Sequence, residues 1–269
     1  MGGVETLRMA EIDAVRFDDG KPSNVSEVLA PEDVLQININ GNPFSVTMRS
    51  PGNDEELVRG LLYTEHVLEE GGYEYAETRD ARSGRVLAVD VTVDPALLSG
   101  DVVLSRSLLS TSSCGLCGRK EMEEMGMGGE PLSPLNPLSA RSIPGMQEIM
   151  RARQELFAQS GGSHAAALFT LDAESLAVYE DIGRHNAVDK AVGSLLLQGK
   201  LDSAECLLVS GRVSYEIVMK AYAARTPFIV AVSAPSSLAA KTCDQLGISL
   251  LGFCRETRAT VYSHPENVV

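Results

Sequence analysis

Positive charge is scarce in this sequence, which has 23 Lys and Arg residues against 37 Asp and Glu residues and a formal net charge of −14. Proteins that bind nucleic acids through the phosphate backbone need clustered Lys and Arg side chains, so we expect no nucleic-acid partner. A local basic pocket for one phosphorylated ligand is still compatible with this charge balance.

Long apolar runs are also missing. No stretch approaches the roughly 18 apolar residues that a membrane-spanning helix requires. The N-terminal segment has several acidic residues and lacks the apolar core of a signal peptide. We therefore expect a cytoplasmic protein that does not enter a membrane.

Several common site motifs do not occur. The phosphate loop Gly-x-x-x-x-Gly-Lys-Ser/Thr and the dinucleotide fingerprint Gly-x-Gly-x-x-Gly are absent, so neither an NTPase nor an ordinary dinucleotide dehydrogenase is indicated. A zinc deaminase needs His-x-Glu, but Ala166 stands where that glutamate would follow His164. We expect no metal site.

Cysteine is sparse, and only Cys114 and Cys117 of the five cysteines lie close together, beside Gly115 and Gly118. In a reducing compartment such a pair favours catalysis, redox chemistry or metal binding over a structural disulfide. A helix starting near Lys120 would lower a thiol pKa, although the acidic run there fits a solvated turn equally well.

Changes in composition and residue pattern along the sequence predict that the chain has four parts. They are an acidic leader over 1–29 that is loose over 1–20, a small α+β unit over 30–110, a mobile Cys-x-x-Cys loop and linker over 111–144, and an α/β cofactor-binding domain over 145–269. In the α+β unit, alternation over 34–40, the hairpin signal Asn40-Gly41 and a strand over 44–48 precede a helix starting at Asp54 and a strand over 85–93.

Strands and helices alternate in the last part. The patterns predict helices over 146–159, 186–197, 215–224 and 236–246, and strands over 165–169, 176–179, 206–210, 228–233 and 248–253. This order favours a mostly parallel sheet covered on both faces, in which ligands bind beyond the carboxyl ends of the strands.

Four polar segments follow these strands: Glu180 to Asn186, Ser210 to Ser214, Ser233 to Ser237, and Phe253 to Arg258. Helix capping would explain part of each of the first three segments, and an exposed polar hairpin would explain the last one. Capping does not need Arg184 and His185, and Arg212 is suited to pair with phosphate in a bidentate way. Together the segments predict a cationic pocket for a phosphorylated, nucleotide-bearing ligand.

The segments also resemble a known family. Ser112 to Gly118, Gly161 to Ala167, Asp181 to Lys190, Ser210 to Arg212 and Ser233 to Ser236 are similar to motifs of the FdhD family of accessory sulfur carriers for formate dehydrogenase. The resemblance covers nearly all of residues 30–265. It implies a three-layer core similar to the cytidine deaminase fold without its zinc, and a homodimer.

The resemblance further implies a function. Sulfur would be taken from a cysteine desulfurase as a persulfide and delivered to the bis-molybdopterin guanine dinucleotide molybdenum cofactor of formate dehydrogenase. Cys114 would carry the persulfide, with Cys117 assisting or resolving, and GDP would bind as a mimic of the cofactor. The residues expected to hold the cofactor are His164, Asp181, Arg184, His185, Asn186, Ser210, Arg212, Ser233, Phe253, Cys254, Arg255, Glu256, Thr257 and Arg258.

Two other functions stay open. In a dithiol redox protein, Cys114 and Cys117 would cycle through a disulfide without a desulfurase. In a non-catalytic chaperone for the cofactor or the apoenzyme, the pair would act only as a ligand. A second reactive thiol at Cys254, within the last of the four polar segments, also stays open.

Overall fold

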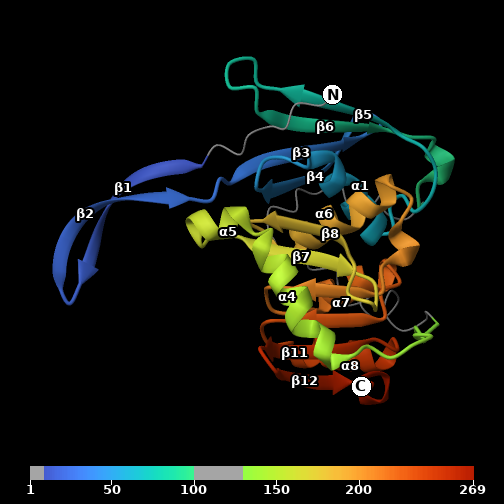
Figure 1. Ribbon diagram of the computed structural model, residues 1–269. Coiled ribbons are helices and arrows are strands. Elements are labelled where there is room, and N and C mark those ends of the chain that lie inside the picture. Colours follow the sequence, from blue (N-terminus) through green and yellow to red (C-terminus); the bar gives the residue numbers. More distant parts are fainter. Residues whose placement is uncertain (1–8, 100–129) are drawn as a thin grey trace.

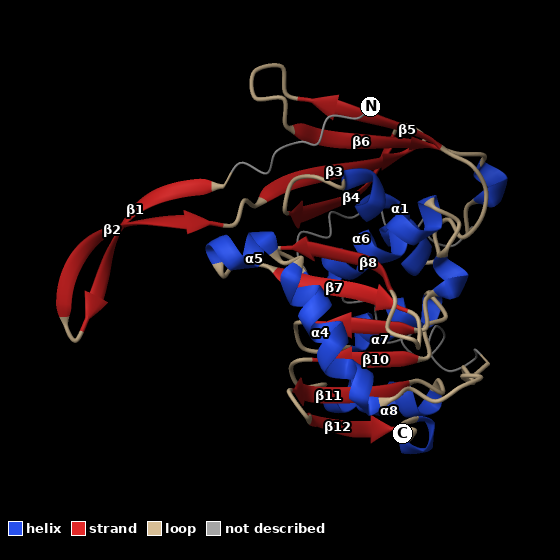
Figure 2. Ribbon diagram, in the orientation of Figure 1, coloured by secondary structure: helices blue, strands red, loops and turns tan. Residues whose placement is uncertain are grey.

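The computed structural model describes residues 9–99 and 130–269. These residues form a two-stranded arm, a four-stranded sheet with one long helix, and a six-stranded sheet with helices on both faces (Figure 1, Figure 2). Cys114 and Cys117, and with them most of the predicted loop over 111–144, lie outside the described residues. Within the described part, no helix is long and apolar enough to cross a bilayer.

The arm is a hairpin that projects away from the rest of the molecule (Figure 1). Its strands β1 (Ala10–Asp18) and β2 (Lys21–Leu29) pair antiparallel along their whole length. Asp19 and Gly20 form the turn with φ of 50° and 78°, and a turn with positive φ at both central residues matches the twist of a hairpin. The prediction that residues 1–20 are loose is therefore wrong for residues 10–20.

The N-terminal sheet has the order β4-β3-β6-β5. Its elements are β3 (Asp33–Ile39), β4 (Asn42–Arg49), α1 (Asp54–Thr64), β5 (Glu74–Arg79) and β6 (Val86–Thr92). The hairpin at Asn40-Gly41 and the helix after Asp54 are confirmed, whereas β5 was not predicted. The apolar face of α1, with Leu57 and Leu62, packs in one buried cluster with the inward residues of β3 and β6.

The C-terminal sheet has the order β12-β11-β10-β9-β7-β8. Its strands are β7 (His164–Phe169), β8 (Ser175–Asp181), β9 (Cys206–Val209), β10 (Phe228–Ala231), β11 (Ser249–Arg255) and β12 (Arg258–Ser263). Only the pairs β9–β10 and β10–β11 are parallel, so the prediction of a mostly parallel sheet is wrong. Short turns join β7 to β8 and β11 to β12, and parallel neighbours would need a crossover of a dozen or more residues.

Helices cover both faces of this sheet. On one face lie α6 (Arg184–Leu197), α7 (Tyr215–Ala223) and α8 (Ser237–Gln245), and on the other lies α4 (Ile143–Ala152) (Figure 1). The part therefore has three layers, as expected, while the likeness to the cytidine deaminase fold stays a prediction. Leu132 and Leu138, at the end of the predicted linker, are buried in the two cores.

The single helix predicted over 146–159 is two helices, α4 and α5 (Glu155–Ser160). The carboxylate of Glu180 on β8 accepts hydrogen bonds from the backbone amides of Leu156 and Phe157, each at 2.8 Å. These amides have no partner within a first helical turn, so the carboxylate stabilises a new helix start at this point.

The two sheets are joined by a close crossing of α1 and α6. A Cβ atom built on Gly60 would lie 1.9 Å from the carbonyl oxygen of Asp189, and one built on Gly193 would lie 1.8 Å from the carbonyl oxygen of Glu56. Only glycine allows the two helix backbones to approach this closely. The crossing therefore depends on both glycines.

We expect Gly193→Ala to lower the free energy of unfolding by about 3 kcal/mol or more, because its methyl group overlaps a backbone carbonyl on α1. Urea denaturation of the purified protein measures this change. The matched control is Gly145→Ala on α4, where a Cβ meets nothing within 4 Å, and the free energy should change by at most about 1 kcal/mol, towards higher stability. Equal effects of the two substitutions would contradict the close crossing.

Candidate functional site

The carboxyl ends of four strands meet at one edge of the C-terminal sheet. Strands β9, β10 and β11 are parallel, so they end together, and β7 is antiparallel to β9 and begins there. Strand β8 is antiparallel to β7 and ends at Asp181 opposite His164. The four polar segments predicted from the sequence therefore lie along a single edge.

Three helices begin at the same edge. Helix α6 starts directly after β8, α7 starts after β9, and α8 starts after β10. The first amides of a helix lack intrahelical partners, and the helix dipole adds positive potential. Ser236 caps α8 by accepting a hydrogen bond from Ala239 N at 3.1 Å, as predicted, whereas Ser214 makes no such bond to α7. The edge favours negatively charged groups.

His164, Gly211 and Arg184 lie next to one another at the centre of this edge. A Cβ atom on Gly211 would lie 3.2 Å from Nδ1 of His164 and 3.8 Å from Cβ of Arg184. Burial lowers the pKa of His164, and the positive charges of Arg184 and Arg212 lower it further. His164 is therefore neutral at pH 7, and the two guanidinium groups supply the positive charge of the site.

Arg184 is the first residue of α6, and it is partly buried. Its Nε is buried without a hydrogen-bond partner among the described residues. A buried donor without a partner costs free energy, which an anion placed at this edge would recover. Arg212, after β9, is exposed at the same edge.

His185 faces the start of α7. Its Nε2 lies 3.3 Å from Oγ of Ser214 and 3.9 Å from a carboxylate oxygen of Glu216. Burial lowers the pKa of His185 to about 4, with further contributions from Arg184 and Lys220. His185 is therefore also neutral at pH 7, and it connects the helix starts of α6 and α7.

The hydroxyl of Ser210 accepts a hydrogen bond from Ala165 N at 2.9 Å, which ties the end of β9 to the start of β7. Ser233 accepts a bond from Phe253 N through its carbonyl oxygen at 3.1 Å. Phe253 has a φ of 51° and is 39% exposed, so an aromatic ring stands at the end of β11 in a left-handed conformation. Such conformations in a non-glycine residue are often retained at binding sites.

Asp181 and Asn186 are held by the protein itself. Asp181 is fully buried, and its Oδ2 lies 2.7 Å from Nζ of Lys190 and accepts a hydrogen bond from Ser50 N at 3.1 Å. Asn186 donates from Nδ2 to Met48 O at 2.8 Å. Both side chains attach the end of β4 to the sheet edge, so they position the site and have little capacity left for a ligand.

The last segment forms the hairpin between β11 and β12. Arg255, Glu256, Thr257 and Arg258 are exposed there, whereas Cys254 is fully buried in the core beneath α4. Burial raises the pKa of the Cys254 thiol to about 11. Cys254 is therefore protonated at pH 7 and shielded from solvent, both of which oppose its being a second reactive thiol.

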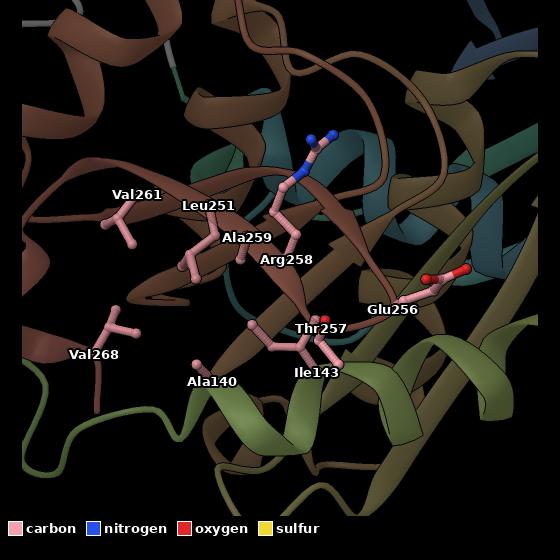
Figure 3. Close-up of a pocket in the computed structure, with 9 residues that line it drawn as sticks. All are labelled: Ala140, Ile143, Leu251, Glu256, Thr257, Arg258, Ala259, Val261 and Val268. Carbon is pink, nitrogen blue, oxygen red and sulfur yellow. The ribbon is translucent and has the colours of Figure 1, made fainter.

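A pocket of about 180 Å³ adjoins this hairpin on the α4 side of the sheet (Figure 3). Most of the residues that line the pocket are apolar, and its polar residues, Glu256, Thr257 and Arg258, come from the hairpin. The full lining is Ala140, Ile143, Leu251, Glu256, Thr257, Arg258, Ala259, Val261 and Val268. In Figure 3 the guanidinium of Arg258 points away from Ala140 and Val268. Arg184, Arg212 and His164 do not line this pocket.

A model of the FdhD/NarQ family matches residues 30–269 of this sequence. The chain belongs to this family. The resemblance seen in the motifs is thus confirmed.

Full-length relatives and one solved structure are similar to this FdhD/NarQ chain. Proteins named sulfur carrier protein FdhD are 40% identical in Streptomyces coelicolor, covering 94% of this chain and 93% of the relative, and 39% identical in Sulfolobus acidocaldarius, covering 97% and 99%. The crystal structure of a protein from Desulfotalea psychrophila, described as a formate dehydrogenase accessory protein, has a TM-score of 0.75 at 22% identity and covers 97% of this chain and 99% of that chain. At this identity the structure shows the fold alone.

Two positioning residues of this FdhD/NarQ chain were not predicted as part of the site. Ser50 lies in a turn after β4 and more than a hundred positions before its partners, so its sequence context signals only a turn. Lys190 lies within the Asp181 to Lys190 motif. Because Lys190 is on α6 and Asp181 ends β8, their separation in the sequence does not indicate that the two side chains pair. Lys190 also donates to Ser50 O at 2.9 Å.

Asp181→Ala should lower the free energy of unfolding by about 3–5 kcal/mol, because it leaves the Lys190 ammonium buried without its partner. Urea denaturation at pH 7 measures the loss. Asp172→Ala, in the exposed turn between β7 and β8, is the matched control and should change the value by less than about 0.5 kcal/mol. A loss below about 1 kcal/mol for Asp181→Ala would mean that the pair does not join the sheets.

Proposed function

We propose that this protein is a sulfur carrier for the maturation of formate dehydrogenase. In this proposal Cys114 accepts sulfur from a cysteine desulfurase and passes it to the bis-molybdopterin guanine dinucleotide molybdenum cofactor, which is the substrate of the transfer. The near-full-length similarity to proteins named sulfur carrier protein FdhD supports the sulfur carrier role.

One observation of the structure carries the choice of substrate. Arg184, Arg212 and His164 gather at a sheet edge where three helices begin, and the buried Nε of Arg184 has no hydrogen-bond partner within the described part. A diphosphate would take up that donor and the free helix amides, since guanidinium groups and helix starts both bind phosphate. The donor set therefore fits the diphosphate groups of a guanine dinucleotide.

The cysteines support the assignment of the thiol. Cys206, Cys243 and Cys254 are all buried, and burial raises the pKa of each thiol. Sulfur transfer requires an accessible thiolate, which none of these three side chains provides. Of the five cysteines, this leaves Cys114 and Cys117 to carry sulfur.

The first transfer balances without any oxidant. The thiolate of Cys114 attacks the terminal sulfur of the desulfurase persulfide, and a new sulfur–sulfur bond forms on Cys114. The bond between the terminal sulfur and the desulfurase cysteine breaks, and that cysteine leaves as a thiolate. Cys117 would then assist delivery or resolve the persulfide: its thiolate would form a disulfide with Cys114, the sulfur–sulfur bond of the persulfide would break, and the outer sulfur would leave as hydrosulfide. A thiol reductant would restore the two thiols.

The described residues would bind and orient the acceptor. Arg184 and Arg212 would hold phosphate oxygens, and neutral His164 would offer a hydrogen bond beside them without adding charge. Phe253 presents an exposed ring at the neighbouring strand end, where a flat base could stack on it. These residues place the ligand, while the transferred sulfur comes from Cys114.

We expect Cys114→Ser to abolish sulfur loading, because a hydroxyl cannot form a persulfide. Mass spectrometry of the protein after incubation with a cysteine desulfurase and free cysteine should find one added sulfur on Cys114 in the wild type and none in the variant. Formate dehydrogenase matured with the variant should be inactive. Cys243→Ser, which changes a buried thiol, is the control and should still load sulfur.

Full formate dehydrogenase activity with Cys114→Ser would contradict the carrier and favour a chaperone that binds the cofactor or apoenzyme. Activity that persists without any desulfurase, together with a reversible disulfide between Cys114 and Cys117, would favour the dithiol redox protein.

A second prediction concerns the ligand. GDP should bind as a mimic of half the cofactor's nucleotide part, and Arg184→Gln should weaken it by at least about tenfold, the equivalent of one charge-assisted hydrogen bond. Isothermal titration calorimetry measures both affinities. Arg258→Ala should also weaken the binding of GDP, because the family resemblance implies that residues 253–258 contribute to holding the ligand.

Arg82→Gln, in the exposed turn between β5 and β6, is the matched control and should leave the affinity for GDP unchanged. Equal binding by Arg184→Gln and the wild type would remove the sheet edge from the site. Equal binding by Arg258→Ala would remove the hairpin alone.

A further inference from the structure

A second pocket, of about 280 Å³, lies at the edge of the C-terminal sheet opposite the candidate site. It is placed where β9 begins and α7 ends, whereas the candidate site is placed where β9 ends and α7 begins. The end of α1 contributes to it from the N-terminal unit. The residues that line this pocket are Tyr63, Leu201, Asp202, Ala204, Ala224 and Arg225. None of them belongs to the site proposed for sulfur transfer.

The floor of the pocket is apolar. Leu201, Ala204 and Ala224 are buried, with at most 7% of their surface exposed. Leu201 begins the short 3-10 helix η3 (Leu201–Ser203), and Ala204 lies between η3 and β9. These three side chains offer a ligand a small hydrophobic surface.

Tyr63, on α1, contributes an aromatic wall whose position is fixed. The guanidinium carbon of Arg59 lies 5.6 Å from the centre of the Tyr63 ring, which is a cation–π contact. Arg59 in turn donates hydrogen bonds to Leu68 O at 2.8 Å and to Glu69 O at 3.0 Å. Burial raises the pKa of Tyr63, and the charge of Glu69 raises it further. The hydroxyl of Tyr63 therefore keeps its proton at pH 7 and can donate a hydrogen bond.

Two opposite charges line the same pocket. Asp202 on η3 and Arg225 after α7 are both exposed, and both lie close enough to the Tyr63 hydroxyl to influence its pKa. Within residues 9–99 and 130–269, neither forms an ion pair with the other or with any other side chain. Arg225 also has a φ of 53°, and left-handed conformations of non-glycine residues concentrate at functional sites. The pocket therefore holds one available anion and one available cation.

This combination of charges restricts the ligand. A simple anion would be attracted by Arg225 and repelled by Asp202, and a simple cation would meet the reverse. A metal ion such as Ca²⁺ needs six or more oxygen ligands, and the side chains of the pocket offer only one carboxylate and one phenol. A free α-amino acid carries a carboxylate and an ammonium group on one carbon atom, so it matches both charges at once.

We propose that this pocket binds a free α-amino acid with a small apolar side chain, such as alanine. Arg225 and the hydroxyl of Tyr63 donate hydrogen bonds to its carboxylate, and Asp202 accepts hydrogen bonds from its ammonium group. Its side chain lies on the apolar floor. The volume is slightly below the range of about 300–1,000 Å³ that is typical of ligand pockets, which suits a ligand of few atoms.

The test compares three ligands that differ in one charge. Isothermal titration calorimetry of the full-length protein at pH 7 and low salt should give a dissociation constant of about 1 mM or lower for L-alanine. Propionate lacks the ammonium group and ethylamine lacks the carboxylate. Each should bind the wild type at least about tenfold more weakly than alanine does, because one charge of the pocket is then left without its partner.

Variants assign the two contacts. Arg225→Gln and Asp202→Asn should each weaken L-alanine at least about tenfold. Asp202→Asn should at the same time strengthen propionate, because it removes the charge that repels a carboxylate. A misfolded variant would lose both ligands, so this gain separates recognition from structure. Lys200→Gln removes a neighbouring exposed cation that does not line the pocket, and it is the matched control that should bind alanine as the wild type does.

Four results would each overturn the proposal. They are no binding of L-alanine at 10 times the expected dissociation constant, equal affinities of the wild type for propionate and alanine, an unchanged ratio of these two affinities in Asp202→Asn, and an equal loss in Lys200→Gln and Arg225→Gln. The proposed sulfur transfer uses none of these residues, so its success or failure is measured independently.

Discussion

The buried joint between α1 and α6 and the end of β4 fixes the relation of the two sheets. Two lysines lie in it: Lys190 pairs with Asp181, and Lys220 lies 2.9 Å from Asp189 and donates to Thr64 Oγ1. Removing charges from water is costly, and the pairs are tolerable because further hydrogen bonds saturate them. Hydrophobic side chains could fill the same space, but they lack directional contacts. The ion pairs and hydrogen bonds therefore restrict how α1 and α6 can be placed along one another more than hydrophobic packing would. The glycines of the crossing bring the backbones close enough for these contacts to form.

The same joint determines where the candidate site stands. Asp181 accepts a hydrogen bond from Gly183 N at 2.8 Å while it holds Ser50 of the other sheet, so the N-terminal unit fixes the turn that places Arg184. A binding group held by residues with locked conformations loses little entropy when a ligand arrives. The sequence of the small N-terminal unit contains no catalytic or binding motif. The unit therefore contributes by holding the residues of the candidate site in position. Loss of the contacts between the N-terminal unit and Asp181 would first displace Arg184.

Sequence patterns predicted the elements around the site well because each is a short apolar run bounded by small or polar residues. Strands β9 and β10 and helices α7 and α8 lie within two residues of their predicted bounds. Strand direction was less accessible, since apolar runs look alike in parallel and antiparallel sheets and only the length of the connection distinguishes them. Strand β5 was missed because five of its six residues are exposed, which hides the apolar signal. The hydrogen bond between Ser50 and Asp181 could not be predicted from the sequence, because it arises only from the packing of the two sheets.

The charge distribution is compatible with the proposed selection of one polyphosphate ligand by an acidic chain. A net charge of −14 repels nucleic acids and other extended polyanions at long range, and salt screens that repulsion beyond about 8–10 Å. Arg184, Arg212 and three helix starts lie together within such a distance, and His164 and His185 beside them are neutral at pH 7. A compact ligand that fits the edge feels the local attraction, whereas a long polyanion must also meet the acidic surface around it. In the proposed function, selectivity for a nucleotide-bearing cofactor would therefore come from a few cations inside a negative field.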